Sequence, residues 1–80
     1  MKVKSIKGTR STATVLFEDN KAIVLMGELT TEPKFYADIS SIKKWEPPFE
    51  NDLITQEIKK DIIKSVEDHS KTAEVKVVFD

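Results

Sequence analysis

Several residue types and patterns are missing from this 80-residue chain, and each absence excludes a class of protein. There is no cysteine, so disulfides, thiolate nucleophiles and cysteine-based zinc sites are excluded, and stability must come from packing. No apolar run approaches the ~20 residues of a membrane-spanning helix, and residues 1–7 are too polar for the core of a signal peptide. We therefore expect a cytoplasmic protein that does not enter a membrane.

Residues that carry catalysis or bind cofactors are also scarce. The two glycines, Gly8 and Gly27, are too few for a phosphate-binding loop, and no nucleotide-binding fingerprint occurs. The lone His69 has no second histidine or cysteine with which to form a metal site, and no serine lies in a nucleophile motif, so we interpret His69 as structural. The sequence therefore predicts no enzyme and no cofactor, and it identifies no catalytic or metal-binding residue.

The length and composition are those of a small globular protein. Eighty residues suffice for one hydrophobic core and not for two, so we expect a single domain over residues 1–80. The net charge is −1, but residues 1–27 carry five basic and two acidic side chains, whereas residues 28–52 carry six acidic and three basic ones. The N-terminal lysines only faintly resemble the basic stripe of a nucleic-acid-binding protein, and the overall acidity (pI ≈ 5.8) argues against one, so no nucleic acid is expected as a direct partner.

Alternating apolar and polar residues predict strands in the first half of the chain. Residues 2–7 form a candidate edge strand rich in lysine, and residues 11–18 alternate over most of their length. Asp19-Asn20 is typical of a tight hairpin turn, so residues 21–28 should return beside the preceding strand. Residues 22–26 are all apolar, which indicates cover on both faces or a central place in the sheet. Residues 34–38 predict a third strand of this meander.

The strands end at a joint built on two consecutive prolines. Residues 39–45 predict either one short helical turn or an irregular loop, and Pro47-Pro48 then stops any helix or central strand and forces the chain to change direction. The flanking aromatic residues Trp45 and Phe49 should anchor this turn. Trp45 has two interpretations, a core residue beneath the joint and an exposed anchor for a partner, of which we favour the first.

The second half of the chain predicts one helix and a final strand. Thr55 is a suitable N-cap for a helix over residues 55–69, and isoleucine or valine recurs every four residues from Ile54 to Val66. Residues 73–80 alternate cleanly and predict a strand. The expected fold class is α+β, a two-layer domain with one main helix packed on one face of an antiparallel sheet, in the order β-β-β-α-β. Two unpaired sheet edges would leave a homodimer through an edge strand open.

Acidic residues gather around the proline joint. Glu46, Glu50 and Asp52 lie close together in the sequence, and Asp38 precedes the joint. They form either part of a solvated surface of mixed charge or an acidic patch that meets a basic surface of a protein partner. On the second interpretation, Asp38, Glu46, Glu50 and Asp52 are the candidate partner-binding residues.

Four stretches of the chain carry a resemblance to a known family. They are Lys7-Gly8-Thr9-Arg10-Ser11, Phe17-Glu18-Asp19, Ser41-Ile42-Lys43-Lys44-Trp45-Glu46-Pro47-Pro48 and Ile54-Thr55. Together they resemble the small bacterial immunity proteins of family 74 of polymorphic toxin systems, and the run from Trp45 to Pro48 is the most specific part. Asn20 departs from this pattern, which has glycine in the hairpin.

The resemblance implies an α+β protein without catalytic activity that binds and neutralises a cognate toxin, typically encoded beside it and often a nuclease. It assigns no residues, so the four acidic positions rest on their charge and loop position. The residues by themselves fit equally well a non-enzymatic ligand-binding or regulatory interaction module of a larger complex.

Overall fold

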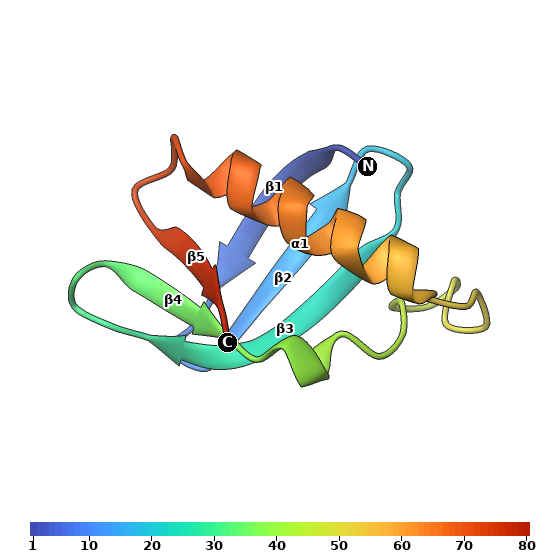
Figure 1. Ribbon diagram of the computed structural model, residues 1–80, viewed down its shortest axis with the longest axis horizontal. Coiled ribbons are helices and arrows are strands. Elements are labelled where there is room, and N and C mark those ends of the chain that lie inside the picture. Colours follow the sequence, from blue (N-terminus) through green and yellow to red (C-terminus); the bar gives the residue numbers. More distant parts are fainter.

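The computed structural model describes all 80 residues and contains five strands, one α-helix and one 3₁₀ turn (Figure 1). The elements are β1 (Val3–Gly8), β2 (Thr12–Phe17), β3 (Ala22–Leu29), β4 (Lys34–Ala37), η1 (Ile39–Ser41), α1 (Gln56–Ser70) and β5 (Lys76–Phe79). The helix lies across one face of a curled sheet, so the expected α+β class is confirmed. α1 lacks the length and the apolar character that a helix needs to cross a membrane.

The sheet is mixed, and the expectation of a purely antiparallel sheet was wrong. The strand order is β1-β2-β3-β4-β5, and neighbouring strands are antiparallel as far as β4. β5 is parallel to β4, with Val77 opposite Phe35. The cause is the connection between them, because the loop and helix after β4 carry the chain back across the sheet, and β5 therefore starts at the same end as β4.

The expected order β-β-β-α-β was also wrong, because it leaves out β1. The candidate edge strand at residues 2–7 is a strand over Val3–Gly8 and pairs with β2 along its length. Val3 is buried and Ile6 packs against the core, so the apolar area of these two side chains holds the segment in the sheet despite its lysines. The observed order is β-β-β-β-α-β.

The β2–β3 hairpin turns where Asp19-Asn20 predicts it. Asn20 has a φ of 71°, in the left-handed region that glycine and asparagine tolerate best. The side chain of Asp19 accepts the backbone N–H of Lys21 at 3.1 Å, and Phe17 N–H donates to the Lys21 carbonyl at 2.8 Å. This geometry explains why an asparagine, which tolerates a left-handed backbone, can stand at this turn.

β3 is the middle strand of the sheet, but only one of its faces is covered. Ile23 and Leu25 are buried on the face of the sheet that the helix covers, whereas Met26 on the opposite face is 50% exposed. β3 pairs with β2 through residues 22–26 and with β4 through residues 27–29. The transition lies at Gly27, where a Cβ atom would collide with the carbonyl oxygen of Tyr36. The sheet therefore curls around the core at this strand, and it is not a flat layer.

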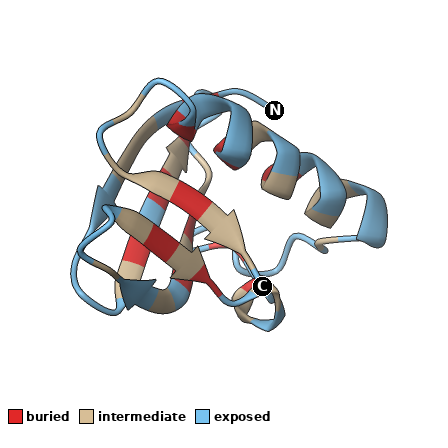
Figure 2. Cartoon of the chain, turned by 60° about the vertical axis from the view of Figure 1, so that its left-hand side comes forward, coloured by how far each residue is buried: buried red, intermediate tan, exposed pale blue.

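The core lies between the helix and the concave face of the sheet (Figure 2). α1 begins after Thr55, whose hydroxyl accepts the N–H of Ile58 at 3.2 Å, and it buries Ile62 and Val66. Trp45 is only 2% exposed. The interpretation of Trp45 as a core residue is therefore confirmed, and Trp45 does not serve as an exposed anchor.

Candidate protein-binding site

The loop of residues 46–53, which we call the acidic loop, projects from the end of the molecule where α1 begins (Figure 1). Its first residue is fixed to the sheet, because Glu46 N–H donates to the carbonyl oxygen of Ala22 at 2.9 Å. The Pro47–Pro48 peptide that follows is cis. The buried ring of Trp45 lies directly before this point, so both the backbone and a large apolar side chain hold the start of the loop.

The rest of the acidic loop is a pair of turns, stabilised by backbone hydrogen bonds and by the packing of Phe49 against the core. Phe49 N–H donates to the Glu46 carbonyl at 3.1 Å, and Asp52 N–H donates to the Phe49 carbonyl at 3.0 Å. The ring of Phe49 is half-buried and packs against the core, as does Ile54 immediately after the loop. Apolar side chains therefore hold both ends and the middle of the loop, which restricts its conformations in the free protein.

Lys21, which directly precedes β3, attaches the acidic loop to the β2–β3 hairpin. Its Nζ lies 3.2 Å from a carboxylate oxygen of Asp52. The same ammonium lies 5.5 Å from the ring centroid of Trp45 and 5.7 Å from that of Phe49, within the range of cation–π attraction. A single cation therefore contacts three residues of the joint, and its charge offsets that of Asp52.

The exposed side chains of the acidic loop include two carboxylates without an ion-pair partner and one leucine. Glu46 and Glu50 are exposed and form no ion pair. Leu53 is 83% exposed, more than any other large apolar residue of the chain. Leu53 and these carboxylates are therefore accessible to a protein partner.

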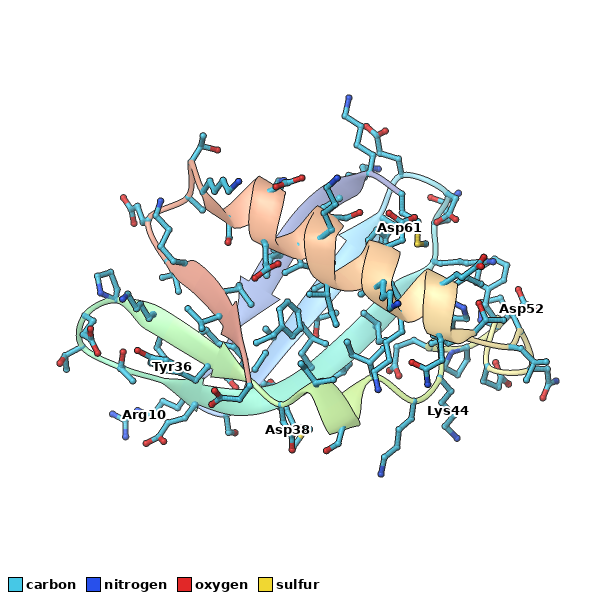
Figure 3. All side chains as sticks on the ribbon, viewed as in Figure 1. Arg10, Tyr36, Asp38, Lys44, Asp52 and Asp61 are labelled. Carbon is cyan, nitrogen blue, oxygen red and sulfur yellow. The ribbon has the colours of Figure 1, made fainter.

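The structure separates Asp38 from the other three predicted acidic residues. Glu46, Glu50 and Asp52 share the acidic loop, whereas Asp38 lies at the end of β4, away from Asp52 (Figure 3). Asp38 caps η1, because Ser40 donates to its Oδ1 from the hydroxyl at 2.7 Å and from the backbone N–H at 2.9 Å. These hydrogen bonds lower the pKa of the Asp38 carboxyl below its ordinary value. Asp38 thus has a local structural role, and its part in binding stays a prediction.

Other chemistry finds little support in the geometry. His69 is exposed in the last turn of α1, where a protonated imidazole interacts favourably with the helix dipole. No group of three or more histidine, aspartate and glutamate side chains comes together in a way that could hold a metal ion.

Sequence reasoning missed two residues of this site. Leu53 lies between Asp52 and Ile54, the first isoleucine of the apolar stripe on the helix. The sequence signal for an exposed leucine was that Leu53 falls outside the four-residue repeat of this stripe. Lys21 follows the hairpin turn in the sequence and is 31 positions from Asp52, so no local pattern connects the two.

Comparisons with known proteins agree with the resemblance described above. No curated protein and no solved structure matches the chain. The family model described as Immunity protein 74 matches residues 5–80, which is nearly the whole chain and includes both the acidic loop and the strands that support it. The chain therefore belongs to the Immunity protein 74 family.

Proposed function

We propose that this protein binds and neutralises a cognate toxin of a bacterial polymorphic toxin system, and that the acidic loop is the surface that contacts the toxin. The observation that carries the proposal is Leu53, a leucine 83% exposed at the end of a loop that the packed side chains of Trp45 and Phe49 hold in place. Binding through a loop that is already ordered costs less conformational entropy than binding through a disordered one. The geometry thus supports an apolar anchor surrounded by charge.

The charge of the acidic loop favours a basic partner surface. Glu46 and Glu50 have no cationic partner in this chain, so their charges are available to a toxin. Nuclease active sites that hold phosphate are basic, and complementary charges speed association and select the correct partner. We therefore propose a nuclease as the class of toxin, inhibited by occlusion of its active site or of a neighbouring surface. This mechanism needs no catalytic group on the immunity protein.

A toxicity rescue assay tests the proposal. The protein is expressed together with the toxin encoded beside its gene, and growth and the Kd of the purified complex are measured. We expect Leu53→Asp to abolish rescue and Leu53→Ala to weaken binding about tenfold or more, as for other interface anchors. Glu46→Lys with Glu50→Lys should slow association most strongly at low salt.

A matched control uses charge reversal away from the loop. Glu67→Lys with Glu74→Lys makes the same change in net charge at two exposed positions near the other end of the molecule, and it should leave rescue intact. Thermal unfolding of every variant shows whether the fold is retained. Full rescue by a folded Leu53→Asp variant would remove the acidic loop from the interface. Failure of the unmodified protein to rescue would instead favour the alternative function, an interaction module of a larger complex.

A further inference from the structure

The two outer edges of the sheet differ in how far their backbone groups are covered. At β5, the N–H groups of Lys76 and Asp80 donate to carbonyls of Pro33 and Ala37, on the side of β4. The N–H of Val77, which points the other way, donates to the hydroxyl of Ser70 at 3.1 Å. Ser70 is buried at the end of α1, so the helix end covers this edge at Val77. The expectation of an unpaired edge therefore does not hold at Val77 of β5.

The edge at β1 is open. Thr9 N–H donates to the Thr12 carbonyl across the β1–β2 turn. Because bonded and non-bonded pairs alternate in an antiparallel ladder, the backbone groups of Gly8 and Ile6 must point away from β2. No hydrogen bond joins these groups to another element of the chain. Gly8 is also exposed, so an added strand could reach its backbone.

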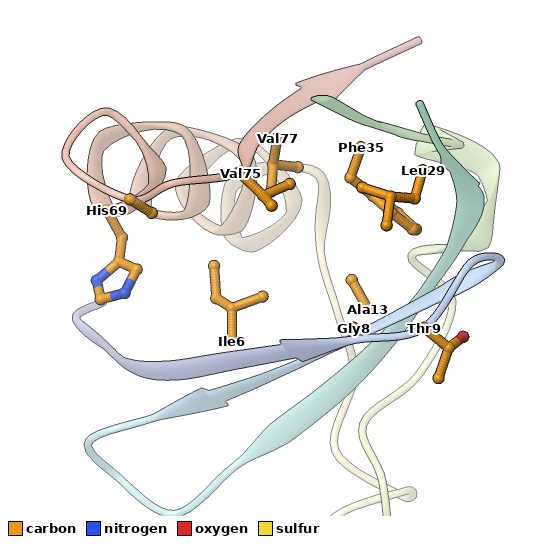
Figure 4. A pocket seen from close by; sticks show the side chains of 10 residues that line it. Ile6, Gly8, Thr9, Ala13, Leu29, Phe35, His69, Val75 and Val77 are labelled. Carbon is orange, nitrogen blue, oxygen red and sulfur yellow. The ribbon is translucent and has the colours of Figure 1, made fainter. Parts of the chain in front are cut away.

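An apolar cavity of about 280 Å³ lies beside this open edge, between β1 and β5 (Figure 4). Ile6 lines it from β1, Val75 and Val77 from the opposite side, and Leu29 and Phe35 from the strands between. A cavity of ~150 Å³ already admits a benzene ring, so this one has room for more than one aliphatic side chain. Leu29, one of the lining residues, is 39% exposed, so part of the lining is accessible to solvent.

The charge on β1 indicates the chemistry of the segment that fits here. Lys2, Lys4 and Lys7 are exposed, none forms an ion pair, and residues 1–8 contain no acidic residue. A second copy of this chain would set lysine against lysine if it paired through β1, which is unfavourable. A strand that carries carboxylates would instead pair its charges with these lysines.

We propose that the edge of β1 binds an extended, acidic segment of a protein partner, which adds to the sheet as a further strand. Side chains alternate across such a strand, so those beside Ile6 and Gly8 enter the cavity and are apolar, and those beside Lys7 are glutamate or aspartate. The main-chain groups of Ile6 and Gly8 bind the backbone of the segment. This site lies at the other end of the molecule from the acidic loop and does not depend on the proposed toxin contact.

The probe is a soluble ten-residue peptide of alternating valine and glutamate with blocked termini. It is titrated into the ¹⁵N-labelled full chain, and amide shifts, amide exchange and Kd are measured. We expect shifts confined to β1 and the cavity residues, and at least tenfold slower exchange of the Ile6 and Gly8 amides. A serine–glutamate peptide of the same length should bind more weakly, because it leaves the cavity unfilled.

Reversal of the lysine charges on β1 distinguishes strand addition from non-specific binding of the peptide. The double variant Lys4→Glu with Lys7→Glu should bind the valine–glutamate peptide about tenfold more weakly and should gain binding of a valine–lysine peptide. The control variant, Lys60→Glu with Lys64→Glu, changes two exposed positions of α1 and should alter the binding of neither peptide. The proposal is overturned by no binding at millimolar peptide, by equal binding to the Lys4/Lys7 variant, or by protection of amides outside β1. Sedimentation that reveals a dimer with protected β1 amides would also overturn it, because the occupant would then be a second copy.

Discussion

The ring of Trp45 meets the ring of Phe17 edge-on, with centroids 5.8 Å apart and planes at 88°. Both side chains are almost fully buried, and they come from different parts of the chain, since Phe17 ends β2 and Trp45 precedes the acidic loop. This contact therefore joins the sheet to the candidate binding surface. The position of Glu46, which follows Trp45 directly, depends on it.

Replacement of Trp45 by alanine should destabilise the whole fold. Loss of a buried tryptophan costs about 3–5 kcal/mol, which is a large part of the 5–15 kcal/mol that typical domains possess. Chemical denaturation followed by circular dichroism measures the effect. Trp45→Phe keeps an aromatic ring beside Phe17, so its loss in the free energy of unfolding should be less than half of that caused by Trp45→Ala. An unchanged midpoint for Trp45→Ala would show that this side chain is not part of the core.

Replacement of Lys21 by glutamine should loosen the acidic loop with little effect on the global fold. The Lys21–Asp52 pair is partly exposed, so we expect a loss below about 1 kcal/mol in the free energy of unfolding. The Asp52 amide, bonded to the Phe49 carbonyl, should exchange with solvent several-fold faster. Lys44→Gln changes the same charge at an exposed lysine that forms no ion pair, and it should leave this amide unaffected.

Local patterns in the sequence predict the elements well and their arrangement less well. The N-cap at Thr55, the hairpin at Asn20 and the apolar stripe ending at Val66 all depend on residues within a few positions of one another, and the structure has each of them. The direction of β5 depends on where a connection of 38 residues returns the chain, which no window of the sequence contains. The alternation over residues 73–80 likewise predicts a longer strand than the observed Lys76–Phe79. The observed strand is shorter because the residues before Lys76 belong to the turn that follows the helix, where the Ala73 carbonyl accepts from the Lys76 ammonium.

The candidate site shows the same limit. The acidic loop could be predicted from the charges around Pro47-Pro48, because those residues are consecutive. Which of its carboxylates are free could not, because Asp52 is paired with Lys21 from the β2–β3 hairpin, far away in the sequence. Long-range pairing decides which charges a partner meets, and it is visible only in the folded chain.

Replacement of Ser70 by alanine should destabilise the contact between α1 and β5. The Ser70 hydroxyl accepts from Val77 N–H and donates to the Glu67 carbonyl at 3.1 Å, so its removal leaves a buried N–H without a partner. An unsatisfied buried donor costs about 1–3 kcal/mol. Ser65→Ala, on the same helix but at a less buried position, is the control and should cost less. Equal midpoints of denaturation for the two variants would contradict this role of Ser70.

The hydrogen bonds from Ser40 to Asp38 make stability depend on pH in the acid range. They lower the pKa of Asp38 in the folded state relative to the unfolded chain, so the folded protein binds fewer protons there. The stabilisation is therefore complete above the unfolded pKa of about 4 and is lost as the pH falls through the folded value. We expect Asp38→Asn to reduce the decline in the free energy of unfolding between about pH 5 and pH 2, measured by denaturation at each pH.

Asp61 supplies the internal control for this experiment. Its pKa is also lowered, first by the hydrogen bond from the N-terminal ammonium at 2.9 Å, so the Asp38→Asn variant should keep part of the acid sensitivity. Ser40→Ala removes the hydroxyl donor and leaves the Asp38 carboxyl in place, and its pH profile should fall between those of the unmodified protein and Asp38→Asn. If Asp38→Asn and the unmodified protein lost stability in parallel over the whole range, the cap on η1 would not be the source of this dependence, because a neutral amide cannot titrate.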